Sequence, residues 1–233
     1  MKVAIMQPYL FPYIGYFQLI QAVDEFIIYD NIQYSKKGWV NRNRILVNGK
    51  DAYLTLSLKK DSDYLNIKDR VLADNWNLER KKIVNGIRAA YSKAPCFPKV
   101  FPLLEEILNH QNQNLFEFIL NSIKQINQYL EIATPLIISS SIQINHDLKS
   151  QNKVLALCKA RHATTYINPI GGIDLYDKDV FNSEGLQLQF LKADNIIYPQ
   201  FQNDFIPFLS IIDVMMFNTR DELLKALTSF TLN

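Results

Sequence analysis

The sequence is poor in the residues that build disulfide and metal sites, with two cysteines and three histidines among 233 residues. Cys96 and Cys158 lie far apart and have no metal-type partner at short spacing. They are typical of buried thiols in a reducing compartment. The histidines show no recognised metal-ligand spacing, since the adjacent pair His146-Asp147 is typical of a solvated loop. We therefore expect no metal site.

The common signatures of cofactor binding and of membrane insertion are also absent. The chain has no Gly-x-x-x-x-Gly-Lys-Ser/Thr phosphate loop, no Gly-x-Gly-x-x-Gly after a strand and no Gly-x-Ser-x-Gly elbow. No apolar run approaches the roughly 18 residues that span a membrane, and Gln7-Pro8 interrupts the first run before signal-peptide length. A net charge of +2 excludes a strongly basic surface. We expect a cytoplasmic protein without a cofactor, a membrane span or specific DNA binding.

What the chain does contain is enough apolar sequence for a packed core, with 48% hydrophobic and 21% charged residues. Its length suits one large domain. We predict a single α/β domain over residues 1–233, in which residues 74–132 form a helical insertion or subdomain packed on the sheet. The expected fold class is a mainly parallel, Rossmann-like sheet with an antiparallel hairpin and a helical middle segment.

The first thirty residues predict a strand–helix–strand unit. Strands are expected at Lys2–Met6 and Phe26–Tyr29, because both runs are apolar without alternation, and a helix is expected at Tyr13–Ala22. Such a unit has a right-handed crossover, and α/β proteins place their sites at the carboxyl ends of its strands. We therefore expect Gln7 and Asp30 at the same rim.

The rest of the chain predicts a hairpin, a helical middle and a second unit of the same kind. Asn48-Gly49 favours a type I′ turn, with a return strand at Tyr53–Leu58. Further strands are expected at Ile67–Leu72, Pro135–Ile138, Thr165–Asn168 and Leu186–Leu191. Helices are expected at Asn75–Tyr91, Leu103–Leu108, Leu115–Leu130 and Asn152–Ala160, with Pro95, Pro98 and Pro102 breaking the chain before the second of them. Ser210 with Asp213 and Thr219 with Glu222 predict capping boxes of the last two helices.

The stretch after the first strand, residues 7–17, holds two prolines, a glycine and five aromatic residues. Proline stops a regular element there, and Gly15 lets the backbone pass where a side chain would clash. This loop either plugs the underside of the sheet or forms the wall of a site. Its position at the carboxyl rim favours a wall lined by Tyr9, Tyr13 and Tyr16.

The segment after the second strand is the best candidate for chemistry. Its cations suit a phosphate or a carboxylate, and its flat rings suit a base or a sugar. An exposed charged loop with Trp39 as anchor is the alternative. The candidate residues are Asp30, Gln33, Tyr34, Lys36, Trp39, Asn41, Arg42 and Arg44.

Three further positions have two interpretations each. Asp213 is a capping carboxylate or a buried base with a raised pKa, and the capping pattern favours the first. Asn168 is a structural amide or a ligand contact at the end of a strand. Gly171-Gly172 either presents backbone N–H groups to an anion or forms an ordinary turn.

Several separated motifs together resemble the WbqC-like family. They are Gln7–Ile20, Asp30–Tyr34, Lys36–Trp39, Asn41–Ile45, Tyr166–Gly172 with Leu175-Tyr176, and Leu209–Val214 with Met216–Asn218. The chain departs from the family pattern at Lys149–Gln151 and at Arg161–Ala163. The resemblance implies a role in bacterial O-antigen or other surface-polysaccharide synthesis, for which a glycine transferase activity has been proposed. It adds Tyr176 to the candidate substrate contacts.

The loop Tyr13-Ile14-Gly15-Tyr16 is also similar to the His-x-Gly-His loop of adenylyl- and cytidylyltransferases, with tyrosine at both histidine positions. A neutral phenol donates a hydrogen bond to phosphate but does not stabilise transition-state charge as imidazolium does. We expect a shared loop geometry rather than the full nucleotidyl transfer.

These observations predict a transferase that joins a small aminoacyl group to a nucleotide-linked amino sugar. The donor would be an aminoacyl-tRNA, a carrier-protein thioester or an adenylate. Asp30 is the expected base, with Gln7 and Asp213 as further catalytic candidates, while Arg and Lys side chains hold phosphates. The alternatives are a nucleotidyltransferase-like enzyme and a non-catalytic saccharide or nucleotide-sugar binding protein.

Overall fold

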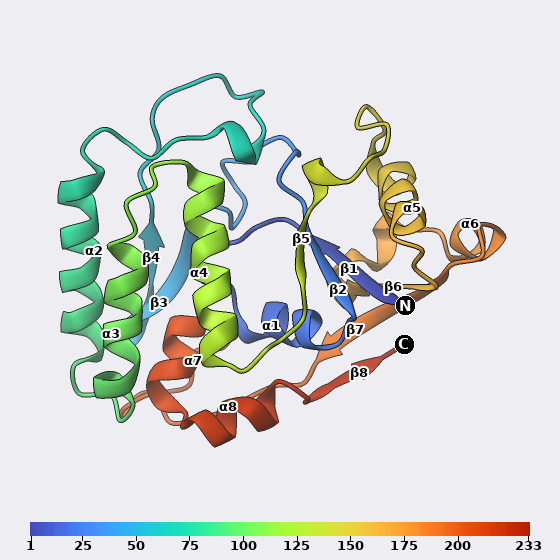
Figure 1. Ribbon diagram of the computed structural model, residues 1–233. Helices are drawn as coiled ribbons and strands as arrows, with labels where there is room; N and C mark the ends of the chain where they lie inside the picture. Colours follow the sequence, from blue (N-terminus) through green and yellow to red (C-terminus); the bar gives the residue numbers. More distant parts are fainter.

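The computed structural model describes all 233 residues and contains two sheets flanked by helices (Figure 1). The strands are β1 Lys2–Met6, β2 Glu25–Ile28, β3 Arg42–Val47, β4 Lys50–Thr55, β5 Leu136–Ile138, β6 Thr165–Pro169, β7 Gln187–Ala193 and β8 Phe230–Leu232. The α-helices are α1 Ile14–Gln21, α2 Trp76–Tyr91, α3 Phe97–Leu108, α4 Leu115–Tyr129, α5 Ser150–Ala160, α6 Lys178–Ser183, α7 Ile211–Phe217 and α8 Arg220–Ala226. Three 3₁₀ turns, η1 Ile67–Asp69, η2 Ser139–Ser141 and η3 Ile170–Leu175, follow or join them.

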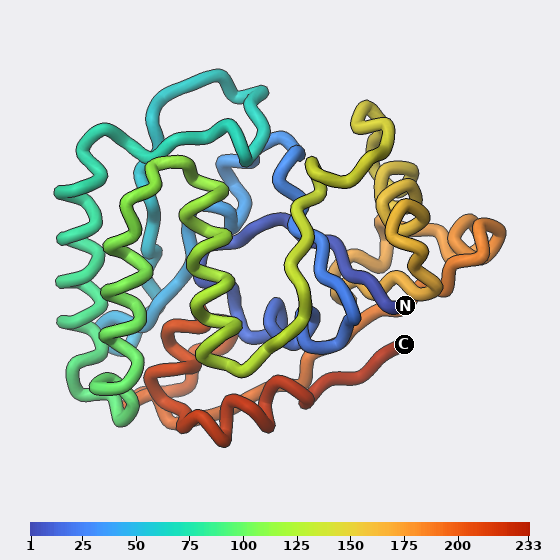
Figure 2. The backbone as a smooth tube through the Cα atoms, viewed as in Figure 1, coloured from blue at the N-terminus to red at the C-terminus, as the bar shows by residue number.

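The main sheet has the strand order β5-β2-β1-β6-β7-β8, and its first five strands are parallel. Only β8 is antiparallel to its neighbour, and this terminal strand was not predicted. The expected fold class, a mainly parallel α/β sheet with a separate antiparallel hairpin, is therefore confirmed. Figure 2 shows that the two ends of the chain lie on the same side of the molecule.

Both faces of the sheet are buried, as the absence of polar alternation predicted. Val3 and Ile5 of β1 belong to a cluster with α5 and α6, whereas Ala4 between them belongs to a larger one. The larger cluster joins this face to α1, to α2–α4 and to α7–α8, which gather on the opposite side of the sheet from α5 and α6 (Figure 1). The organisation of residues 1–233 as one domain with an inserted helical segment stays a prediction.

The hairpin β3–β4 turns at Asn48-Gly49 as predicted, where both residues adopt positive φ, 50° and 74°. Its return strand is Lys50–Thr55 and not Tyr53–Leu58, because pairing with β3 begins directly after the turn, at Lys50 opposite Val47. The capping box of α8 is also confirmed, because Thr219 and Glu222 bond each other's backbone N–H. Asn114 likewise caps α4 by accepting from the backbone N–H of Glu117. Local side-chain chemistry therefore predicted the hairpin turn and the start of α8.

Two predictions of local structure are wrong. Ile67–Leu72 is not a strand, because its backbone crosses the end of β2, with Ile67 N and Lys68 N donating to the carbonyls of Ile32 and Asp30. The prolines before Leu103 do not break the chain, because α3 starts at Phe97 and contains Pro98 and Pro102. Pro98 lies in the first turn, where its missing N–H has no partner in any case. The cost of Pro102 is offset by a face that buries Val100, Phe101 and Leu104.

Candidate functional site

The strands β1 and β6 separate at their carboxyl ends. They pair only at Lys2–Thr165 and Val3–Tyr166, so the later residues of each strand lack the other as a neighbour. The chain also changes direction in the sheet here, since β2 follows β1 on one side and β6 joins it on the other. Ligands of open α/β sheets bind in the crevice at such a switch point.

A cavity of about 340 Å³ occupies this crevice. Ten of its fifteen lining residues are hydrophobic, and its polar groups are few, which is typical of a small-molecule site. Its walls come from the aromatic loop, α1, β3, the ends of β6 and β7, and the segment before α7. The lining residues are Met6, Tyr9, Pro12, Tyr13, Gly15, Tyr16, Leu19, Trp39, Asn43, Arg44, Pro169, Ile170, Leu191, Ala193 and Phe208.

The aromatic loop is held in a strained conformation by two buried side chains. Phe11 has a φ of 42°, a region that bulky residues rarely adopt. Its carbonyl accepts from Asn43 Nδ2 at 2.9 Å and from Ser210 Oγ at 2.7 Å. Asn43 Nδ2 also donates to the carbonyl of Leu10 at 2.9 Å. Strain that the surroundings fix in this way is a feature of functional sites.

The tyrosines of the loop face the cavity as neutral groups. Burial raises the pKa of Tyr9, of Tyr13 and, most strongly, of Tyr16. The Tyr16 hydroxyl donates to the carbonyl of Gln7 at 3.0 Å, while the Tyr13 ring meets Phe208 edge-on at 5.6 Å. These rings can therefore contact a ligand through their faces and donate hydrogen bonds, but they carry no charge near neutral pH.

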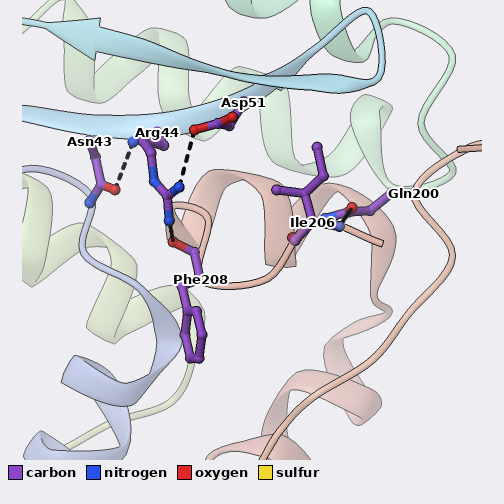
Figure 3. A network of polar contacts seen from close by, with 6 residues as sticks. All are labelled: Asn43, Arg44, Asp51, Gln200, Ile206 and Phe208. Carbon is purple, nitrogen blue, oxygen red and sulfur yellow. Dashed lines mark hydrogen bonds and ion pairs between the residues drawn. The ribbon is translucent and has the colours of Figure 1, made fainter. Parts of the chain in front are cut away.

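Arg44 is the charged residue of the cavity wall (Figure 3). Its Nη1 bonds Asp51 Oδ2 at 3.1 Å, and its Nη2 makes a long contact of 3.4 Å with the carbonyl of Phe208. Its Nε is buried without a partner. Asn43 Oδ1 accepts from the backbone N–H of Arg44 at 2.8 Å, so one short stretch of β3 fixes both the loop and the guanidinium (Figure 3).

Asp30 lies outside the cavity lining, at the end of β2, and is 1% exposed. Its Oδ1 accepts from Ser139 Oγ at 2.8 Å and from Ser140 N at 2.9 Å, and its Oδ2 accepts from Ser140 Oγ at 2.6 Å. Both serines belong to η2, directly after the neighbouring strand β5. Tyr29 N donates to the carbonyl of Met6 at 2.8 Å, and Met6 lines the cavity. Asp30 is the next residue after Tyr29 in the chain.

Further polar side chains extend this region, which we call the rim cluster: Tyr29, Asp30, Asn31, Ser139, Ser140, His146 and Lys153. His146 Nδ1 lies 2.9 Å from Asn31 Nδ2, and its Nε2 lies 3.0 Å from the carbonyl of Ile142. Lys153 donates to the carbonyl of His146 at 3.1 Å and lies over the Tyr29 ring. Burial lowers the pKa of Lys153, and the nearby charges of Asp30 and Asp147 oppose that shift.

Asp213 does not cap α7, so the favoured interpretation of this residue is wrong. Ser210 accepts from the N–H of Ile212, whereas the Asp213 carboxylate turns into the protein. It is fully buried and accepts from Tyr91, Tyr198 and Gln200 at 2.8, 2.8 and 2.7 Å. Burial raises the pKa of Asp213, and these three donors lower it. Gln200 in turn accepts from the N–H of Ile206 (Figure 3), so this carboxylate ties the loop before α7 to α2 and α7.

The residues of the segment 31–44 are divided between the cavity and internal contacts. Trp39 lines the cavity and stacks on Tyr53 at 6.3 Å. Tyr34 donates to Asn41 Oδ1 at 2.8 Å, and Asn41 donates to the carbonyl of Leu56, so both side chains form hydrogen bonds within the protein. Arg42 donates to the carbonyls of Lys37 and Gly38, Lys36 pairs with Asp63 at 2.6 Å, and Gln33 donates to the carbonyl of Asp63.

The candidate residues after β6 lie outside the cavity lining as well. Asn168 Oδ1 accepts from Tyr166 at 3.0 Å, and the Tyr166 hydroxyl lies 3.2 Å from that of Tyr176. A Cβ on Gly172 would lie 2.1 Å from Asn168 Nδ2, so the buried amide requires glycine there, whereas a Cβ on Gly171 would meet open space. Tyr176 lines a separate polar hollow with residues 149–152.

The structure thus brings Tyr9, Tyr13, Tyr16, Trp39 and Arg44 together, and it groups Asp30 with serines that the sequence did not indicate. Asn43 was also missed, although it lies within the run Asn41-Arg-Asn-Arg that was singled out. Phe208 and Ser140 could not be identified from the sequence, because their contacts are with distant parts of the chain. Phe208 lines the cavity against Tyr13, and Ser140 donates to Asp30. No group of three or more His, Cys, Asp or Glu side chains lies close enough to hold a metal ion, and none of the helices combines the length and apolar character that crossing a membrane requires.

Comparison with known proteins gives two matches. The profile of the WbqC-like protein family matches residues 7–225. The uncharacterized protein Rv1507c of Mycobacterium tuberculosis (strain ATCC 25618 / H37Rv) is 32% identical over 225 residues, which is 95% of each chain. The family match covers the aromatic loop, the rim cluster and Arg44 alike. On both criteria, the chain belongs to the WbqC-like protein family.

Proposed function

We propose that this protein is a transferase of surface-polysaccharide biosynthesis that attaches glycine, or another small aminoacyl group, to the amino group of a nucleotide-linked amino sugar. The observation that carries the proposal is the aromatic cavity where β1 and β6 separate, with the buried carboxylate of Asp30 on the same carboxyl edge of the sheet. Membership of the WbqC-like family supports a role in polysaccharide biosynthesis.

The cavity suits the sugar and the phosphate nearest to it. A sugar ring presents C–H faces that pack on aromatic rings, which Tyr13 and Trp39 supply. A phosphate oxygen can accept from the unpartnered Nε of Arg44. Tyr13, at the N-cap of α1, makes no side-chain bond to the backbone N–H groups of the first turn, so a phosphate oxygen can accept from those that have no other partner. The nucleoside would extend from the cavity mouth.

Asp30 would act on the sugar amine through Ser140. The Ser140 hydroxyl is half-buried and already donates to Asp30, so it can receive the amine proton while passing its own proton to the carboxylate. The amine nitrogen then forms a bond to the acyl carbon, and the bond from that carbon to the donor's oxygen or sulfur breaks. The leaving group departs with the electron pair and takes up a proton. General-base assistance of this kind contributes about 10²–10⁴-fold.

The acyl donor must be activated, because a free carboxylate does not acylate an amine unaided. An aminoacyl-tRNA, a carrier-protein thioester or an acyl adenylate would meet this need. The remaining rim amides, Gln7 and Asn168, and the backbone N–H groups of Gly171 and Gly172, are proposed to contact the acyl oxygen or sugar hydroxyls.

The test is to incubate the protein with nucleotide-linked amino sugars and each class of glycyl donor, and to search for the amide by mass spectrometry. The expected product gains the mass of one glycyl group. Asp30→Asn should lower turnover about 10²-fold or more, whereas Asp24→Asn, at an exposed carboxylate, should not change it. Unchanged turnover in Asp30→Asn with the true substrate pair would exclude Asp30 as the base.

A nucleotidyltransferase-like reaction is the second candidate, because the loop Tyr13–Tyr16 lines the cavity in the place that a nucleotide-binding loop would occupy. That reaction releases pyrophosphate from a nucleoside triphosphate. Pyrophosphate release that needs the sugar but no aminoacyl donor would favour it over aminoacyl transfer.

A further inference from the structure

Arg70, directly after η1, is a buried cation without a protein partner. The residue is 4% exposed, and its side chain forms no hydrogen bond or ion pair with the protein. Its Nε and Nη2 are both buried. A guanidinium is charged at every physiological pH, so burying it without an acceptor is unfavourable. The two unpartnered nitrogens share one edge of the guanidinium plane, from which two parallel N–H groups project.

The same edge is filled in other arginines of this protein. In Arg161, Nε and Nη2 donate to the two carboxylate oxygens of Glu25 at 2.8 and 2.6 Å. In Arg42, they donate to the carbonyls of Gly38 and Lys37 at 3.2 and 2.8 Å. Arg44, Arg80, Arg88 and Arg220 each have at least one acceptor. Arg70 differs from all of them because none of its guanidinium nitrogens has an acceptor in the protein.

Two further cations, Lys36 and Arg42, act on the Tyr34 ring that Arg70 covers. The Arg70 guanidinium lies over the Tyr34 ring, 4.7 Å from the centroid. Burial raises the pKa of Tyr34, and the charges of three cations oppose that rise: Arg70, Arg42 and Lys36. Asp63 is an acid that interacts with both Lys36 and Arg70, and it is an exposed side chain already paired with Lys36. An exposed pair of this kind opens readily, which would free Lys36 for a ligand.

We propose that Arg70 forms a phosphoryl-binding site in which two phosphate oxygens accept from Nε and Nη2, with Lys36 and Arg42 adding charge. Tyr34 supports the guanidinium plane from below, as a stacked ring does. The site uses none of the residues that line the aromatic cavity. It does not depend on the proposed reaction, because it is defined by anion binding alone.

The experiment compares melting temperatures in chloride and in inorganic phosphate or pyrophosphate at matched ionic strength. For the natural protein, the melting temperature should rise by about 3–6 °C for each tenfold increase of the anion above its dissociation constant. Arg70→Met should melt at the same temperature as the natural protein, or higher, in chloride, because an unpaired buried charge is removed, and should lose the response to phosphate. Arg70→Lys, which keeps the charge but not the fork, should show a reduced response.

Arg161→Met is the matched control, because its fork already holds Glu25. It should melt lower in both buffers and keep the full phosphate response. The proposal is overturned if the natural protein responds to neither anion, or if Arg70→Met melts lower than the natural protein in chloride and keeps the phosphate response. A response to the carboxylate of glycine without one to phosphate or pyrophosphate would also overturn the phosphoryl assignment.

Discussion

The cavity at β1 and β6 and the rim cluster at β2 and β5 lie on the same carboxyl edge of one sheet, yet they are built in opposite ways. The cavity is hollow and mainly apolar, and Arg44 holds a donor without an acceptor. The rim cluster is filled, and the carboxylate of Asp30 receives three hydrogen bonds from the chain itself. Binding capacity and proton chemistry are therefore supplied by neighbouring but different pairs of strands.

The topology explains the difference. β1 and β2 pair along four residues and β2 and β5 along three, so their ends stay together and their side chains bond one another. β1 and β6 pair along two residues and then separate, and the aromatic loop only partly fills the space between them. We infer that substitutions in the rim cluster affect folding and function together, whereas substitutions in the cavity affect binding alone.

The largest effect is expected for Asp30→Ala in the rim cluster. The change leaves the hydroxyl and the N–H of Ser140 without their acceptor, whereas the Ser139 hydroxyl keeps Asn31 Oδ1. The free energy of unfolding should fall by about 3 kcal/mol. Urea unfolding of the variant and of Asp204→Ala, at an exposed carboxylate that accepts no hydrogen bond, measures it. Equal stability of the two variants would contradict the account of a filled, self-bonded cluster.

Next in size is the effect of filling the cavity from Gly15. A Cβ at this position would lie 3.6 Å from Ala193 and Tyr13, an ordinary contact, so Gly15→Ala should fold well and gain helix stability of up to about 1 kcal/mol. Gly15→Leu places a longer side chain in the cavity and should weaken binding of the nucleotide-sugar at least tenfold. Calorimetric titration of both variants tests this, and equal affinities would show that the ligand binds elsewhere.

The smallest effect is a pH dependence that arises in the rim cluster. Burial raises the pKa of Tyr29 to about 12, with the nearby Tyr176 adding to the shift. A group whose folded pKa is raised above the unfolded value of about 10 stabilises the fold below pH 10, and this contribution is lost as the pH rises to 12. Tyr29→Phe should therefore show a shallower loss of stability between pH 10 and 12. Identical alkaline profiles would contradict the shift.

Much of the fold was predictable because its signals are local. Unbroken apolar runs identified β1 and β2 as strands buried on both faces, and Asn48-Gly49 identified the hairpin turn. The rule that sites lie at the carboxyl ends of parallel strands placed the aromatic loop and Asp30 on one edge. The failures have local causes too. Proline within α3 is outweighed by the burial of its apolar face. Ile67 and Leu72 are buried by packing, without forming a strand between them.

The site was less predictable because its residues depend on distant partners. Asp213 fits a capping pattern in the sequence, yet its carboxylate accepts a hydrogen bond from Tyr91, which lies 122 positions away. Asn41 and Asn43 are equivalent in the sequence pattern, but their contacts differ. Asn41 bonds Tyr34 and the carbonyl of Leu56, which are near it in the chain. Asn43 instead bonds the carbonyl of Leu10 and so holds the aromatic loop. The unpaired fork of Arg70 has no sequence signature, since it is defined by the absence of acceptors around it.

The most direct test of the central claim is a crystal structure with a nucleotide-linked amino sugar bound. The account predicts the sugar ring against Tyr13 and Trp39, a phosphate oxygen on Arg44 Nε, and the amine facing Ser140. A sugar bound away from the crevice between β1 and β6, with the aromatic cavity unfilled, would contradict it.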